Sequence, residues 1–369
     1  MRLPSQLAIL LILPAVFVLG GCGTSTHVCN LSGCCGPGVA ACPAQPYLFA
    51  TGVSGEVSVF PVFGNGALGA SVASATAPAT TLGMTVLNNQ FLYISDFQNS
   101  SLDAWSINLG TGALTDVSGS PFSLGQFSLG AGLATNGTAG VVYVADVAKI
   151  DAFKADPTGA LTPLPESPFA SGTNIFLTVD PQNRFVFASS DDPPGSIFAF
   201  TADPTGALTP VPGSPFATIP NFVGNTRPGE IAVDSTGSFV YTALTGTNQV
   251  AAFSIAAPSG VLTPVPGSPF TAGNSPLTLT TVNNFLYVSN DGSVSGYSIA
   301  PTTGVLTPLS GSPFAIVGAA LTTDPGGRFL YASSAAGIFA YSIDSTGGLT
   351  PIAGSPFPAA GATVLTFVQ

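Results

Sequence analysis

Few residues of this sequence could carry chemistry. The 369 residues include 6 Lys and Arg, 17 Asp and Glu, and one histidine, His27, which lies near the N-terminus. The run Arg227-Pro228-Gly229-Glu230 stands out because it joins a carboxylate to a guanidinium. Glu230 could act as a general base on water, and Arg227 could hold a developing oxyanion. Arg227 and Glu230 are therefore the candidate catalytic residues.

The same two residues also have a structural interpretation. A nearby arginine lowers the pKa of a carboxyl group, which would weaken Glu230 as a base near neutral pH. Residues three apart point to opposite faces of a regular strand, unless Pro228-Gly229 interrupts it. We therefore favour a structural ion pair beside the long loop 217–227, and keep an active site or a ligand contact as alternatives.

A second candidate set consists of polar side chains that follow β-like runs: Asp96, Asp146, Asp191, Asp192, Asn290 and Asp291. Such oxygens suit Ca²⁺. Their spacing is irregular, so we interpret them as solvated turn formers and expect neither a metal nor a cofactor, with Ca²⁺ as the alternative. Asp180 with Arg184, and Asp324 with Arg328, are expected to form local turn pairs.

Residues 1–21 indicate an export signal. Arg2 precedes an apolar run of 13 residues, shorter than the roughly 20 that span a bilayer. The run ends in Leu19-Gly20-Gly21-Cys22, which resembles the bacterial lipobox. This resemblance implies a lipid on Cys22 and a protein anchored in the bacterial cell envelope, facing a periplasmic or external space. An ordinary secretory signal is the alternative.

Residues 22–45 form a Cys- and Gly-rich segment that we interpret as a tether. It contains all the remaining cysteines: Cys29, Cys34, Cys35 and Cys42. An even number in an oxidising compartment favours two disulfides. A bond between adjacent Cys34 and Cys35 would be strained, so two pairings stay open. A zinc cluster with His27 is the alternative, although the spacing lacks a C-x-x-C pair.

The composition of the chain favours an all-β fold. Only 6% of residues are charged, while Gly and Pro together number 77. Helix surfaces usually carry Glu and Lys, which are scarce here. The 26 Phe and 8 Tyr supply enough apolar surface for a core. A net charge of −11 argues against nucleic acid or an anionic membrane surface as a partner.

Internal repeats predict the architecture. A Gly-x-Leu-Thr phrase recurs seven times, with its Leu every 43 to 54 residues, and the first copy, Gly66-Ala67-Leu68, lacks the Thr. Six copies are followed by Ser-Pro-Phe, which ends at Phe122, Phe169, Phe216, Phe270, Phe314 and Phe357. We expect these Phe side chains to pack between neighbouring repeats.

Each repeat contains four strand-like runs. In the sixth they are 276–282, 285–290, 293–299 and 305–308. Four strands at this period are typical of a β-propeller blade, so residues 46–369 are predicted to form seven four-stranded blades. The first repeat begins with a second-strand sequence at 46–50, and a first-strand sequence occurs at 362–368. The two ends of the chain should therefore complete one blade.

The repeats resemble the lactonase-type seven-bladed propellers, which include 6-phosphogluconolactonases and the related Tyr-Val-Thr-Asn repeat proteins. The second strands Phe239-Val240-Tyr241-Thr242 and Phe285-Leu286-Tyr287-Val288-Ser289-Asn290, with the Gly-x-Leu-Thr phrases, carry this resemblance. In that family an Arg-Pro-x-His segment leads an inner strand. Here Arg227 and Pro228 match, but Glu230 replaces the histidine, and the second strand that follows lacks the family's acid. The resemblance implies the fold strongly and the reaction weakly.

Two functions remain open. The scarcity of charged and nucleophilic groups favours a binding or interaction module in the cell envelope, with an unidentified protein or small molecule as its ligand. The family resemblance favours a hydrolase that opens a lactone ring. Phosphorylated sugars are poor substrates for either, because Lys149, Lys154, Arg184 and Arg328 are expected in outer strands or turns. We expect a monomer held at the membrane by its lipid.

Overall fold

The computed structural model describes residues 45–52, 55–78, 81–124, 132–318, 320–359 and 361–368. These residues belong to one compact unit, Ala44–Gln369. The predicted signal and lipidation site, and the four cysteines and His27 of the tether, lie outside the described residues. No helix in the described ranges is long and apolar enough to cross a bilayer.

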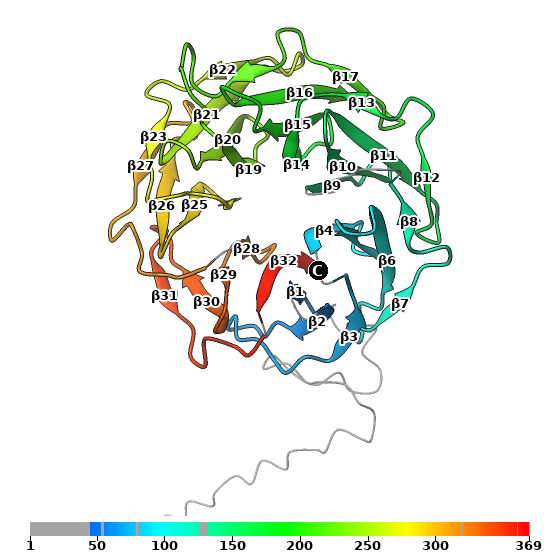
Figure 1. The fold of residues 1–369 in the computed structure, drawn as a ribbon. Coiled ribbons are helices and arrows are strands. Elements are labelled where there is room, and N and C mark those ends of the chain that lie inside the picture. The colour runs from blue at the N-terminus through cyan, green and yellow to red at the C-terminus, as the bar shows by residue number, and fades with distance from the viewer. Residues whose placement is uncertain are drawn as a thin grey trace, which may run out of the picture. The chain divides into compact units, whose positions relative to one another are not determined.

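Seven antiparallel sheets form a ring of blades, each running from a first strand at the centre to a fourth strand at the rim (Figure 1). The all-β, seven-bladed propeller is thus confirmed. The first strands are β32 (Ala362–Val368), β4 (Thr81–Leu87), β9 (Leu133–Asn136), β14 (Asn174–Val179), β19 (Pro228–Val233), β24 (Leu279–Val282) and β28 (Leu321–Thr323). We number blades 1 to 7 in this order.

The other strands follow in the same blade order. The second strands are β1 (Tyr47–Gly52), β5 (Phe91–Asp96), β10 (Val141–Asp146), β15 (Phe185–Ser190), β20 (Phe239–Leu244), β25 (Phe285–Asn290) and β29 (Phe329–Ser334). The third strands are β2 (Glu56–Pro61), β6 (Ser101–Ile107), β11 (Lys149–Ala155), β16 (Ser196–Ala202), β21 (Gln249–Ile255), β26 (Ser293–Ile299) and β30 (Gly337–Ile343). The fourth strands are β3 (Ala73–Thr76), β7 (Leu114–Asp116), β12 (Leu161–Pro163), β17 (Leu208–Pro210), β22 (Leu262–Pro264), β27 (Leu306–Pro308) and β31 (Leu349–Pro351).

Blade 1 closes the ring with both ends of the chain. Strand β32 pairs with β1 in a register that sets Tyr47 opposite Val368 and Phe49 opposite Thr366. The predicted two-ended blade is confirmed. Closure removes the sheet edge that β1 would otherwise expose.

The Ser-Pro-Phe phrases tie each blade to the next. In blade 4 the Ser214 hydroxyl oxygen accepts the Ala199 N–H at 3.0 Å, and the same bond recurs in the other blades that carry the phrase. Phe216 packs, half-buried, on the apolar cluster between blades 4 and 5. The expected inter-blade packing is thus confirmed. In four blades the phrase adds a short fifth strand that the sequence did not predict: β8 (Phe122–Ser123), β13 (Phe169–Ala170), β18 (Phe216–Ala217) and β23 (Phe270–Thr271).

A tyrosine hydroxyl forms a second link between blades. Buried Tyr143 of β10 donates to the Gly206 carbonyl oxygen of the next blade at 2.8 Å. The same bond is made by Tyr93, Tyr241, Tyr287 and Tyr331. Phe49 and Phe187 replace the tyrosine in blades 1 and 4. These links hold five of the second strands against the turn before the fourth strand of the next blade.

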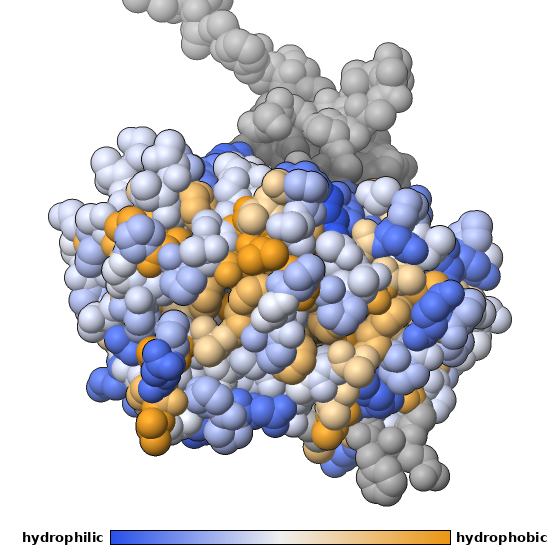
Figure 2. All heavy atoms as spheres, turned by 90° about the horizontal axis from the view of Figure 1, so that it is seen from above, coloured by the Kyte–Doolittle hydropathy of each residue, from blue (hydrophilic) through white to orange (hydrophobic). Residues whose placement is uncertain are grey.

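The rim of the ring ends in short strands. Five of the fourth strands finish at a proline, which cannot donate to a further strand: Pro163, Pro210, Pro264, Pro308 and Pro351. In the edge-on view of Figure 2, apolar residues gather along the middle of the outer wall and hydrophilic ones lie mostly toward its two faces. The prolines protect this wall against strand addition.

Candidate functional site

The first strands surround the axis of the ring, where they enclose a small cavity (Figure 1). Its volume is about 120 Å³. Six blades contribute to its lining: Gly132, Leu133, Phe176, Leu177, Glu230, Thr278, Ala320, Leu321, Thr363, Val364 and Leu365. Most of these side chains are apolar, and Glu230 is the ionisable one. This central channel is therefore the candidate functional site.

Glu230 is fixed between two blades. Its N–H donates to the Leu277 carbonyl oxygen at 2.8 Å, and its carboxylate Oε2 accepts the Leu279 N–H at 2.8 Å. Gly229 allows this approach, since a Cβ there would lie 2.5 Å from the Leu277 oxygen. The Glu230 side chain is thus held in the channel wall by the first residue of β24 and by the segment that leads into that strand.

Burial changes the acidity of this carboxyl group. Loss of solvent raises the pKa of Glu230 to about 7, and the hydrogen bond from Leu279 only partly opposes the rise. The expectation that Arg227 lowers this pKa is wrong. A group with a pKa near 7 populates both its acid and base forms at neutral pH, which suits proton transfer.

The structure separates Arg227 from Glu230. Arg227 is exposed, has a positive φ of 48°, and donates its backbone N–H to Asn225 Oδ1 at 2.8 Å. The register between β19 and β20 shifts between Pro228 and Ile231. The strand is therefore interrupted at Pro228-Gly229, the possibility that the sequence left open. Among the described residues Arg227 forms no ion pair with Glu230 and does not line the channel. The expected ion pair is not found.

The other expected cations of the ring are held by local partners. Arg184 pairs with Asp180 at 2.9 Å and Arg328 with Asp324 at 3.2 Å, as predicted for these turns. Lys149 lies between Asp146 and Asp151, at 3.0 and 2.8 Å. Lys154 donates to the Ala139 carbonyl oxygen. None of the four lines the central channel.

The polar residues at the ends of second strands bond locally instead of meeting at one point. Asp96 accepts the N–H groups of Gln98 and Asn99 in its own turn, at 2.9 and 3.2 Å. Asp192 accepts the Thr173 N–H at 2.8 Å. Within the described ranges no three acidic, His or Cys side chains gather as metal ligands. The hydrogen bonds of Asp96 are those of a turn former, but the expectation that this set is solvated is wrong for Asp96, Asp146 and Asn290, which are buried.

Sequence reasoning missed most of the channel lining. Phe176, Thr278 and Thr363 belong to first-strand regions whose residues do not repeat from blade to blade. The available signal was position, because each lies in or beside the first strand-like run of its repeat. Alternation along a strand alone does not say which face meets the axis.

Comparison with known proteins supports the fold. Residues 212–318 match a family model described as "Lactonase, 7-bladed beta-propeller". No curated protein sequence matches the chain. The matched region covers all the strands of blades 5 and 6 and the segment that leads to blade 7, and it includes Glu230.

Solved structures with the same ring are distant in sequence. A candidate 6-phosphogluconolactonase from Bacteroides uniformis aligns with a TM-score of 0.71 and 18% identity, over 88% of this chain and 100% of that one. The periplasmic gluconolactonase of Pseudomonas aeruginosa aligns with a TM-score of 0.67 and 15% identity, over 88% and 99%. At this identity the likeness shows the fold alone, a seven-bladed propeller.

Proposed function

We propose that this propeller is a lactonase-like hydrolase that opens an uncharged lactone in its central channel. The observation that carries the proposal is the position of Glu230, the one ionisable side chain in the described lining of the central cavity, where loss of solvent raises its pKa to about 7. The matched family model and the gluconolactonase with the same fold support this class of reaction.

In the proposed reaction Glu230 is the general base. Its carboxylate takes a proton from a water molecule, which attacks the lactone carbonyl carbon. The ring C–O bond then breaks, and the departing oxygen takes the proton back from Glu230 to give a hydroxy acid. Oε2 is engaged by Leu279, so Oε1 is the oxygen that exchanges the proton. The Thr363 hydroxyl donates to the Thr51 carbonyl oxygen at 3.4 Å, and by turning from this long bond it can donate to the lactone carbonyl oxygen instead.

The charge of the site restricts the substrate. A phosphate group would meet Glu230 in a lining without a cation, while the nearest arginine in the sequence is exposed. Desolvating an anion in that setting is costly. We therefore expect turnover of neutral lactones and none of phosphorylated ones.

Hydrolysis of a lactone panel by the purified full-length protein tests this proposal. Glu230→Gln should lower the rate by about 10²–10⁴, the contribution typical of a general base. The wild-type rate should rise with pH through about 7, as the carboxylate forms. Glu166→Gln, at an exposed position, is the matched control and should leave the rate unchanged.

A binding module is the second candidate. It is favoured by the hydrogen bond from Leu279 to Glu230, which gives the carboxylate a structural role, and by the absence of a second acid in the described lining. Absence of turnover above background for every lactone, or turnover unaffected by Glu230→Gln, would favour this candidate over the hydrolase.

Anchoring in the bacterial envelope through a lipid on Cys22 is part of the proposal. It rests on the apolar run that ends in Leu19-Gly20-Gly21-Cys22. Cys22→Ser should release the protein from the membrane fraction, because acyl chains supply the anchoring energy. A variant that still sediments with membranes, together with a wild type of unmodified mass, would contradict the lipid anchor.

A further inference from the structure

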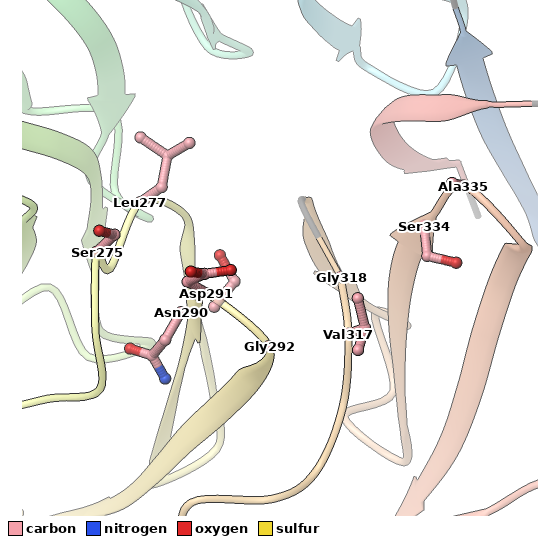
Figure 3. A pocket seen from close by; sticks show the side chains of 10 residues that line it. Ser275, Leu277, Asn290, Asp291, Gly292, Val317, Gly318, Ser334 and Ala335 are labelled. Atoms are coloured by element: carbon pink, nitrogen blue, oxygen red, sulfur yellow. The ribbon is translucent and has the colours of Figure 1, made fainter.

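A second cavity lies beside the channel, where blades 6 and 7 meet. Its volume is about 310 Å³, and Figure 3 shows Leu277 on the segment from blade 6 and Val317 on the segment from blade 7. The same two segments continue into the channel wall, because Thr278 and Ala320 line the central cavity. The Thr278 hydroxyl is hydrogen-bonded at 2.7 Å to the hydroxyl of Ser289, which lines the second cavity. The two cavities therefore share a wall at Thr278 and Ser289.

Most of the surface of the second cavity is apolar. Leu277 and Val317 are 45% and 63% exposed, respectively. The hydroxyls of Ser289 and Ser334 are engaged in hydrogen bonds within the protein, Ser334 with a carbonyl oxygen at 3.1 Å. Among the described residues the ionisable group of the lining is Asp291, which is exposed at the turn between β25 and β26. Such a lining favours an uncharged aliphatic group and disfavours an anion.

Both cavities lie toward the face of the ring where second strands end and first strands begin. Other exposed apolar side chains belong to connections at this same face: Phe97 and Val147 follow second strands, and Val223 precedes a first strand. At the opposite face, turns of neighbouring blades bond to one another through polar side chains, as when Asn283 Nδ2 donates to the Gly327 carbonyl oxygen at 3.0 Å. An apolar ligand is therefore expected to approach from the face that holds the two cavities.

We propose that the second cavity is a subsite for an unbranched alkyl substituent of the substrate, so that the lactones this protein takes are alkyl-substituted. The inference rests on the proposed hydrolysis in the channel. Leu277 joins the two sites, because its carbonyl oxygen accepts the Glu230 N–H at 2.8 Å while its side chain lines the second cavity. The substituent of a lactone ring held beside Glu230 extends over Leu277 toward Val317. Asp291 disfavours a chain that ends in a carboxylate.

Binding of lactams tests the subsite without the reaction, because lactams resist hydrolysis. The probes are δ-valerolactam and δ-decanolactam, which carries a pentyl chain beside the ring nitrogen, titrated calorimetrically into the full-length protein. The chain should lower the Kd about tenfold, the gain expected when roughly two methylene groups leave water. Leu277→Ser and Val317→Ser should each remove most of this gain. Val147→Ser is the matched control, because Val147 is also 45% exposed at this face but lines neither cavity, and it should keep the gain.

Hydrolysis of the matching lactones separates the subsite from the proposed reaction. The KM for δ-decanolactone should be about tenfold lower than that for δ-valerolactone, and a chain that ends in a carboxylate should lose this advantage. No hydrolysis of either lactone, together with chain-dependent lactam binding that Leu277→Ser removes, would support the subsite and refute only the hydrolase. Equal Kd values for the two lactams, or a chain preference that survives in both Leu277→Ser and Val317→Ser, would overturn the subsite whether or not lactones are hydrolysed.

Discussion

The outer three strands of each blade differ sharply from the first strand. Every second strand has six residues, and six of the seven fourth strands have three. First strands range from three residues in β28 to seven in β4 and β32. Pairing of first strands is also irregular, with register shifts in β4, β14, β19 and at the beginning of β32.

The outer strands support the ring, whereas the first strands determine which groups face its axis. Outer strands meet the same neighbours in each blade, so the same residues recur there: the Ser-Pro-Phe phrase and the tyrosine link. First strands meet at the axis, where each blade has different neighbours. The proposed channel site depends on one of these irregularities, the interruption of β19 beside Glu230.

The largest expected effect is at β32, the first strand that closes the ring. Deleting residues 361–369 removes buried Ala362, Leu365 and Val368 and leaves one edge of β1 unpaired. We expect aggregation or loss of cooperative unfolding, measured by calorimetry. Deletion of residues 23–43 is the control and should change the melting midpoint less. An unchanged midpoint after removal of 361–369 would show that the ring is stable without its closing strand.

The second prediction concerns the free energy of unfolding that is lost when the Glu230 carboxyl group ionises in the channel wall. Its pKa is higher in the folded protein than in the unfolded chain, so the folded state binds more protons between about pH 4.5 and 7. Stability should therefore fall as pH rises through this window, by about 3 kcal/mol in total. Urea unfolding at pH 4.5 and pH 8 measures this loss. Glu230→Gln should abolish that part of the pH dependence. An identical pH dependence in wild type and variant would contradict the raised pKa of Glu230.

The smallest expected effect lies in the repeated frame. Tyr143→Phe removes the hydroxyl that reaches Gly206 of the next blade and should lower the free energy of unfolding by about 1 kcal/mol. Tyr47→Phe is the matched control, because the Tyr47 hydroxyl forms no hydrogen bond with the described residues. Equal losses in the two variants would mean that the inter-blade bond contributes nothing specific. Equilibrium denaturation resolves the difference.

The sequence was sufficient for the frame because its signals are local. Ser214 and Phe216 belong to one short phrase that follows a fourth strand at a fixed offset in six repeats, so the phrase itself is visible without knowledge of its contacts. Ring closure was equally predictable, since the first repeat lacks a first strand and the C-terminus supplies one. The short fifth strands were missed, because two paired residues leave no alternation to detect.

The site was predictable only in part. Glu230 was a candidate because of its chemistry, but its place in the channel wall was not predicted and its pKa was predicted in the wrong direction. Arg227 is near Glu230 in the sequence, whereas the hydrogen bonds of Glu230 come from Leu277 and Leu279, which lie in the next blade. The first strand of blade 6 was expected over 276–282 and begins at Leu279. Its early residues bond across blades, which no local pattern records.

The pairing of β1 with β32 also determines the order in which the protein can be completed during synthesis. Tyr47 and Val368 are partners, so one edge of β1 stays unpaired until a strand about 320 residues further along the chain has been translated. A nascent chain therefore cannot close its ring before β32 has left the ribosome. In the proposed export of this protein the delay is an advantage, because translocation requires an open polypeptide.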